Sequence, residues 1–309
     1  MPIPAEFFAL AKEVNNWGRW GAADERGTLN LITADAVRSA AAEVRDGKRF
    51  SLAIPMSLDG PQLGFVPGRT NPTRTTIAHF ELYGEDERGI RFNDDAVQMG
   101  VQAATHWDSL GHASYDGRLY NGFAVASIDP DSGAGRLGAE KLGAIVGRGV
   151  LLDLPRALGV ERLAGGHALT STDLDAAEEA GNVRVGSGDI VLLRTGQMQH
   201  LHAGDKMSYC ISTAGPSTQT VKWFHERGVA AVATDNLSFE VYPGEDDDVM
   251  FPVHMLHLVE MGLPQGQNFD LEALAADCAG DGRYSFLLSA TPEPIVGATG
   301  APVAPIAIK

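Results

Sequence analysis

The spacing of hydrophobic positions changes along the chain and predicts an order of strands and helices. Continuous apolar runs predict strands buried on both faces at 143–155 and 188–196. Shorter apolar segments predict further strands at 50–58, 75–84, 229–236 and 284–292. Helices are expected where apolar residues recur every three or four positions, at 35–47, 171–181, 217–228, 251–262 and 270–278.

Polar residues and glycines mark the ends of these helices. Thr33 and Thr172 are expected to cap the first two, because a hydroxyl accepts a hydrogen bond from a free backbone N–H. Gly228 is expected to end the third. Strands come first, then strands and helices alternate without a linker or an internal repeat. We therefore expect a single α/β domain over residues 1–309, with an N-terminal helical segment, 1–48, packed on it.

Charge and cysteine content exclude several classes of protein. The 309 residues carry a formal net charge of -16, which argues against nucleic-acid or anionic-membrane partners. Cys210 and Cys278 are too few for a disulfide framework. The N-terminus lacks the pattern of a signal peptide, and no apolar run is long enough to span a bilayer. A cytoplasmic location is the simplest expectation.

Three polar segments are interpreted as loops. Residues 59–74 are rich in glycine and proline, and a loop of that length is often functional. GAGRLG at 133–138 matches GxGxxG, but no strand precedes it, so a glycine-rich loop is the better interpretation than a dinucleotide site. The acidic run 244–249 is expected to be solvated.

The richest chemistry lies in ATHWDSLGHASYDG, residues 104–117. It places His106, Asp108 and His112 within seven positions, and these residue types bind divalent metals or transfer protons. If the chain is extended here, His106 and Asp108 point to one side and Trp107 to the other. Gln102 joins the first side if the extension persists. The spacing alone leaves open a metal site, an acid–base pair or a hydrogen-bonded Asp–His pair.

A longer stretch, DDAVQMGVQAATHWDSLGHASYDGRLYNG, resembles the cyclase-like metal-dependent hydrolases, the family of bacterial kynurenine formamidase and isatin hydrolase. Their hallmark is HxGTHxDxPxH. WGAADERGTLNLI, GRTNP, GDIVLLRTG and FPVHMLHLVEMG are also similar to long members, so the resemblance covers nearly the whole chain. It implies a swivelling β/β/α fold with a mixed sheet, a zinc or manganese cofactor, and assembly as a homodimer or homotetramer.

The resemblance also assigns roles by position. His106 and Asp108 match metal ligands, and His112 matches the general acid/base. His254 matches a later histidine ligand, and Gln267 falls where formamidases place a glutamate ligand. On this basis we expect hydrolysis of a small cyclic amide, N-acyl amide or lactone. A dehydratase or cyclase using the same metal, and a non-catalytic small-molecule-binding protein on a degenerate hydrolase fold, are the alternatives.

The departures from the hallmark change the expected metal content. The first histidine is Gln102, and the proline is Leu110. With glutamine also at 267, Asp108 is the only anionic ligand, and two dications held by one negative charge would repel strongly. We therefore expect one divalent metal per chain, Mn²⁺ or Zn²⁺. The oxygen-rich ligand set favours a harder ion such as manganese.

Four other residues are candidates for contact with the substrate. Arg74 has the planar fork that holds a carboxylate, or it is a surface arginine. Trp17 and Trp20 either wall an apolar pocket or fasten the N-terminal segment to the core. Tyr115 follows His112 closely, and is expected near the substrate or orienting that histidine.

Overall fold

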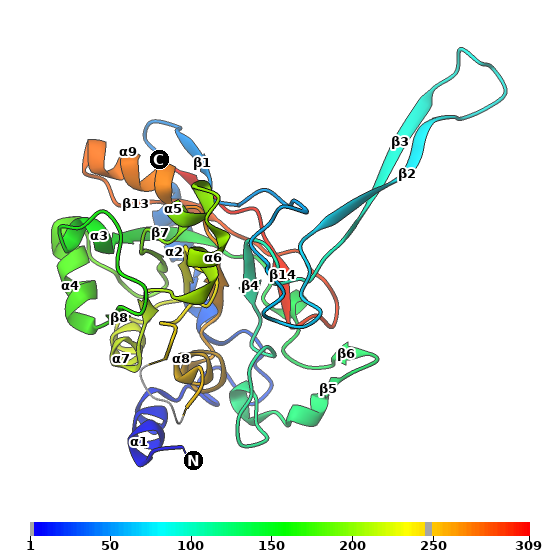
Figure 1. Cartoon of the computed structure of the whole chain (residues 1–309). Helices are drawn as coiled ribbons and strands as arrows, with labels where there is room; N and C mark the ends of the chain where they lie inside the picture. The colour runs from blue at the N-terminus through cyan, green and yellow to red at the C-terminus, as the bar shows by residue number, and fades with distance from the viewer. Residues whose placement is uncertain (1–2, 245–248) are drawn as a thin grey trace.

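The computed structural model describes residues 3–244 and 249–309, and its centre is one mixed sheet (Figure 1). In spatial order its strands are β1 (Arg49–Ser51), β15 (Ile306–Ile308), β13 (Ser285–Ser289), β7 (Val146–Asp153), β9 (Ile190–Arg194), β11 (Ala231–Thr234), β12 (Gln265–Gln267), β4 (His106–Asp108) and β14 (Gly300–Pro302). Strands β7, β9, β11 and β12 run parallel, and the strands on both sides of this group pair antiparallel. The predicted α/β class with a mixed sheet is confirmed.

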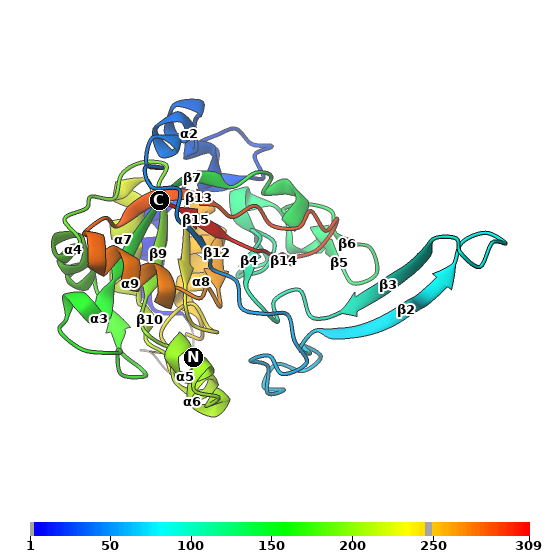
Figure 2. The ribbon, with the colours of Figure 1, turned by 90° about the horizontal axis from the view of Figure 1, so that it is seen from above.

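Helices lie on both faces of this sheet and beyond its edges (Figure 2). The α-helices are α1 (Ala5–Val14), α2 (Ala34–Ala41), α3 (Leu154–Ala157), α4 (Ser171–Ala180), α5 (Met198–His202), α6 (Lys206–Ile211), α7 (Thr218–Arg227), α8 (Pro252–His254) and α9 (Glu272–Asp281). Short 3-10 turns are η1 (Gly27–Leu31), η2 (Tyr120–Gly122), η3 (Val125–Ser127) and η4 (Ala139–Lys141), and η5 (Met255–Met261) is a π-helix. Two minor ribbons pair β8 (Ala168–Leu169) with β10 (Gly215–Pro216), and β5 (Ile128–Asp129) with β6 (Gly133–Ala134).

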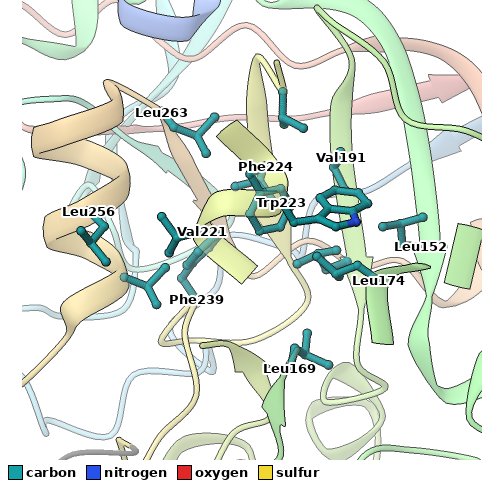
Figure 3. Close-up of a cluster of buried hydrophobic side chains, with 14 of the residues drawn as sticks. Leu152, Leu169, Leu174, Val191, Val221, Trp223, Phe224, Phe239, Leu256 and Leu263 are labelled. Atoms are coloured by element: carbon teal, nitrogen blue, oxygen red, sulfur yellow. The ribbon is translucent and has the colours of Figure 1, made fainter. Parts of the chain in front are cut away.

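Alternate side chains of the central strands enter two hydrophobic cores. On β7, Leu152 faces the core formed with α4, α7 and η5, whereas Leu151 faces the core formed with α9. On β9, Val191 faces the first of these cores and Leu192 faces the second. Figure 3 shows the first core, where Trp223 and Phe224 of α7 lie between the sheet and the π-helix. Burial on both faces explains why these strands have continuous apolar sequences.

Several predicted boundaries are corrected by the backbone. Thr33 caps α2 as expected, and Gly228 ends α7 with a left-handed φ of 63°. The cap of α4 is Thr170 rather than Thr172, because Thr170 forms a reciprocal capping box with Asp173. The strand expected at 50–58 stops at Ser51, and beyond it Ala53 forms an isolated bridge to Phe269.

A long two-stranded arm leaves the body of the molecule (Figure 1). It pairs β2 (Thr73–Leu82) with β3 (Arg91–Gln98), and most of its side chains are exposed. The strand expected at 75–84 therefore exists, but it belongs to the arm. We call this pair, together with the connection between its strands, the β2–β3 arm (residues 73–98).

Helices of the N-terminal segment contact the body of the molecule. Helix α1 contacts η5 and α7, and α2 contacts β7. Thr28 donates both its backbone N–H and its hydroxyl to Gly262 O at the end of η5. No helix in the described parts of the chain combines the length and apolarity that a bilayer crossing requires. Of the acidic run 244–249, residues 245–248 lie outside the described residues.

Candidate active site

Strand β4 orients the first two predicted ligands. His106 and Asp108 point to the same side, with His106 Nε2 3.6 Å from Asp108 Oδ1. Trp107 points to the opposite side, packs edge-on against Phe269 and donates its indole N–H to Ala290 O at 2.8 Å. The alternation expected from the sequence is confirmed, and the buried tryptophan fixes β4 in the core.

The tautomer of His106 follows from its hydrogen bond. Its Nδ1 lies 2.7 Å from the carbonyl oxygen of Ala104, which can only accept, so Nδ1 carries the proton. Burial lowers the pKa of His106 to about 4, and the ring is therefore neutral near pH 7. Its Nε2 then presents a lone pair toward Asp108.

Gln267 completes a group of acceptor atoms. It lies opposite His106 in the β12–β4 register, and its amide nitrogen donates to Asp108 Oδ2 at 2.7 Å. Asp108 Oδ1 and Gln267 Oε1 are both buried without a hydrogen-bond partner among the described residues. Burial opposes ionisation of Asp108, but His112, His106 and His254 and the Gln267 amide hold its pKa below the usual value.

His112 stands over the same carboxylate. Its Nε2 is 3.7 Å from Asp108 Oδ1, and its Nδ1 is 3.4 Å from the amide nitrogen of Gln102. Burial lowers the pKa of His112, with Asp108 acting in the opposite direction. The expected extension back to Gln102 is wrong, because β4 begins only at His106 and residues before it form turns. Gln102 therefore meets His112 and does not lie on the strand with His106.

Glu240, a residue that the sequence analysis missed, forms hydrogen bonds with both the backbone and the ring of His254. The buried Glu240 carboxylate accepts the backbone N–H of Val253 at 3.0 Å and of His254 at 2.9 Å. It also bonds Nδ1 of the His254 ring, and this bond raises the pKa of His254 although burial would lower it. The ring lies 6.4 Å, between centroids, from that of His112.

These groups open into a pocket of about 830 Å³. Its lining comprises Phe65, Val66, Arg69, His106, Asp108, His112, Ala113, Ser114, Cys210, Ile211, Leu237, Ser238, Tyr242, Met250, Phe251, His254, Met255 and Gln267. Most of its wall away from β4 is apolar. The expected loop 59–74 supplies Phe65, Val66 and Arg69, so its position at the pocket agrees with a functional role.

The other four candidates lie away from this lining. Arg74 is on the β2–β3 arm, exposed and paired with Asp95. Trp17 donates its indole N–H to Val259 O at 2.7 Å, and Trp20 lies beside Arg19. Tyr115 bonds Glu260. The structure thus supports the alternative interpretation of Arg74 as a surface arginine and of Trp17 as a fastening for the N-terminal segment.

The chemistry of the donor set fits a cation. His106 Nε2 lies 3.6 Å from Asp108 Oδ1, and both Asp108 Oδ1 and Gln267 Oε1 are buried acceptors without a partner among the described residues. Acceptors without a donor can be satisfied by a positive charge. Among residues 3–244 and 249–309, no group of three or more His, Cys, Asp or Glu side chains is arranged to hold a metal. A cation beside His106 and Asp108 would therefore need a further ligand of another kind, and the amide oxygen of Gln267 is such a donor.

Comparison with known proteins gives a family match. Residues 25–241 match a family model described as "Putative cyclase". No match was found among curated proteins.

Similar solved structures share this fold. A structure described as a novel cyclase is 38% identical, with a TM-score of 0.87, covering 96% of this chain and 100% of its own. Isatin hydrolase A from Labrenzia aggregata, bound to benzyl benzoate, is 19% identical with a TM-score of 0.62, covering 87% and 94%. A predicted metal-dependent hydrolase from Bacillus stearothermophilus is 17% identical with a TM-score of 0.54, covering 85% and 98%. The expected cyclase-like fold is confirmed.

Proposed function

The chain belongs to the cyclase family, and we propose that it is a metal-dependent hydrolase of a small cyclic amide, N-acyl amide or lactone. The observation that carries this proposal is the group of buried acceptors at His106, Asp108 and Gln267, with His112 directly above it. The isatin hydrolases and the metal-dependent hydrolase with the same fold support the reaction class.

His106, Asp108 and Gln267 would hold one divalent metal, Mn²⁺ or Zn²⁺, with His254 at its edge. A metal bound there supplies a Lewis acid, which polarises a carbonyl and makes water more acidic. We expect one metal because Asp108 is the only carboxylate among the proposed ligands.

His112 transfers the proton in this proposal. Its Nε2 takes a proton from the attacking water and returns it to the leaving amine or alcohol. Nε2 is a base only when the proton of the neutral ring is on Nδ1. Gln102 then has to turn its amide so that its oxygen, rather than its nitrogen, faces Nδ1. Gln102 is thus a positioning residue for His112 as well as a predicted ligand.

The test is the His112→Ala variant, assayed with its metal content against a panel of cyclic amides, lactones and N-formyl compounds. We expect the metal to remain and activity to fall by about 100-fold or more, since general acid–base catalysis contributes roughly 10²–10⁴-fold. His202→Ala, an exposed histidine paired with Asp270, is the control. Full activity in His112→Ala would contradict the assigned role. Release of water from the substrate, instead of its uptake, would favour the dehydratase alternative.

We also propose that the chain forms a homodimer or homotetramer through the β2–β3 arm. The arm carries large apolar side chains that are mostly exposed: Ile77, Phe80, Tyr83, Ile90, Phe92 and Val97. A two-stranded ribbon with neither face covered is marginal in water, so another surface is expected to cover it. Covering these six would bury on the order of 600 Å² per arm.

A second copy of this chain is the proposed occupant. In a two-fold dimer each arm would lie on the partner. The total buried area would then include both arms and the two surfaces that they cover. That total exceeds the roughly 1,200 Å² at which specific interfaces begin. The body also exposes apolar side chains at the pocket mouth, including Phe65, Val66 and Met250.

A further inference from the structure

Arg69 is the arginine that enters the pocket. It belongs to the loop before β2, where its N–H donates to Val66 O at 3.1 Å and closes a turn. Its stem runs across Gly100, which follows β3, and a Cβ on Gly100 would lie 3.1 Å from Arg69 Cγ. Glycine at position 100 therefore leaves room for this side chain at the root of the arm.

The guanidinium of Arg69 has no hydrogen bond or ion pair with any residue in 3–244 or 249–309, although the side chain is half-buried. By contrast, the half-buried Arg148 and Arg194 each bind two carboxylates. A guanidinium offers five N–H donors, and no nitrogen of Arg69 is among the fully buried atoms without a partner, so these donors keep contact with the open pocket and can bind a ligand there. Burial lowers the pKa of Arg69 and Asp108 raises it, so the group lies within electrostatic range of the site.

The surroundings define what would satisfy these donors. Asp108 is turned toward His106, His112 and Gln267, and it forms no ion pair with Arg69 within 4 Å. The neighbouring wall is apolar, with Phe65 and Val66 from the same loop. A charge-assisted bond is stronger in such surroundings than in water. The complementary ligand is a small anion with an apolar body.

We propose that Arg69 binds the carboxylate of a small ligand whose apolar part lies against Phe65 and Val66. This assignment rests on the proposed function, in which the carboxylate belongs to the substrate or to the acid that hydrolysis releases. It replaces Arg74 as the carboxylate-binding arginine. Arg69 selects anionic ligands, whereas His112 carries the proton transfer.

The experiment is calorimetric titration of the purified, metal-containing protein with benzoate and with benzamide, its neutral counterpart. Arg69→Met should weaken benzoate binding about 10- to 100-fold, because hydrogen bonds to charged groups are lost. Arg69→Lys should recover part of this affinity. Benzamide carries no charge, so its affinity should be the same for the wild type and for these variants. Arg74→Met is the matched control on the exposed arm and should bind benzoate like the wild type. Circular dichroism checks that each variant is folded.

Equal benzoate affinity in the wild type and Arg69→Met would overturn the proposal, as would no benzoate binding to the wild type. The titration needs no turnover. Loss of benzoate binding in Arg69→Met together with no hydrolysis of any substrate would therefore keep this inference and contradict the proposed function.

Discussion

At the scale of single residues, the site is defined by which atoms lack a partner. Asp108 Oδ1 and Gln267 Oε1 are buried acceptors with no donor among the described residues. The Ala104 carbonyl fixes the proton of His106 on Nδ1 and leaves Nε2 as a third acceptor. A buried acceptor without a donor costs free energy, and we propose that a cation would satisfy these atoms.

Glu240 is expected to control metal affinity through His254. The Glu240→Gln variant keeps the size of the side chain but weakens its hold on Nδ1 of the ring. Outer partners of this kind typically contribute 10- to 100-fold to metal affinity. We therefore expect the dissociation constant for Mn²⁺ or Zn²⁺ to rise by about that factor, measured by competition with a chromogenic chelator.

The control for this prediction is Glu260→Gln. Glu260 is also buried, but it bonds Asn15 and Tyr115 away from the pocket lining. The metal affinity of the Glu260→Gln variant should match that of the wild type. An unchanged dissociation constant in Glu240→Gln would show that His254 is not held for the metal.

Site residues that lie on one short element can be predicted from the sequence, whereas those brought in from distant segments cannot. Alternation along a strand was enough to place His106 and Asp108 on one side. It failed at Gln102, because turns precede β4. Glu240 lies 14 positions before His254 with no local motif between them. Arg69 and Arg74 are both in the expected loop segment, and only the fold shows which one enters the pocket.

At the scale of elements, burial decided which strands could be recognised. β7 and β9 pack on both faces, so their apolar runs identified them. β3 contains Asn93, Asp94 and Asp95 and is exposed, so it carries no such signal and was not predicted. The same exposure makes the β2–β3 arm unusual, because it carries large apolar side chains in contact with solvent.

Replacing apolar side chains on the arm should change the oligomeric state. The triple variant Phe80→Glu, Tyr83→Glu and Phe92→Glu places charge where the proposed interface would exclude water, and two of these rings already contact each other, Tyr83 and Phe92. We expect the wild type to be a dimer or tetramer and the variant a monomer in light scattering coupled to size-exclusion chromatography. Val296→Glu, an exposed site off the arm, should leave the assembly intact. A monomeric wild type, or a triple variant that stays assembled, would contradict the role of the arm.

At the scale of the whole molecule, the fold brings distant segments to one edge of the sheet. β4 pairs with β12 and β14, so residues near 107, 266 and 301 meet at the site. The protein carries a net charge of -16, but only one carboxylate, Asp108, belongs to the proposed ligand set. The single negative charge of this set therefore leads us to expect one metal. Two dications beside one carboxylate would repel each other strongly.

The most direct test of this account is the metal content of the protein purified without added metal or chelator, counted per chain by plasma mass spectrometry. The account predicts about one manganese or zinc per chain. Two metals per chain would contradict the argument from Gln102, Gln267 and the single carboxylate of Asp108. No metal, even after Mn²⁺ and Zn²⁺ are added back, would contradict the hydrolase and favour a small-molecule-binding protein.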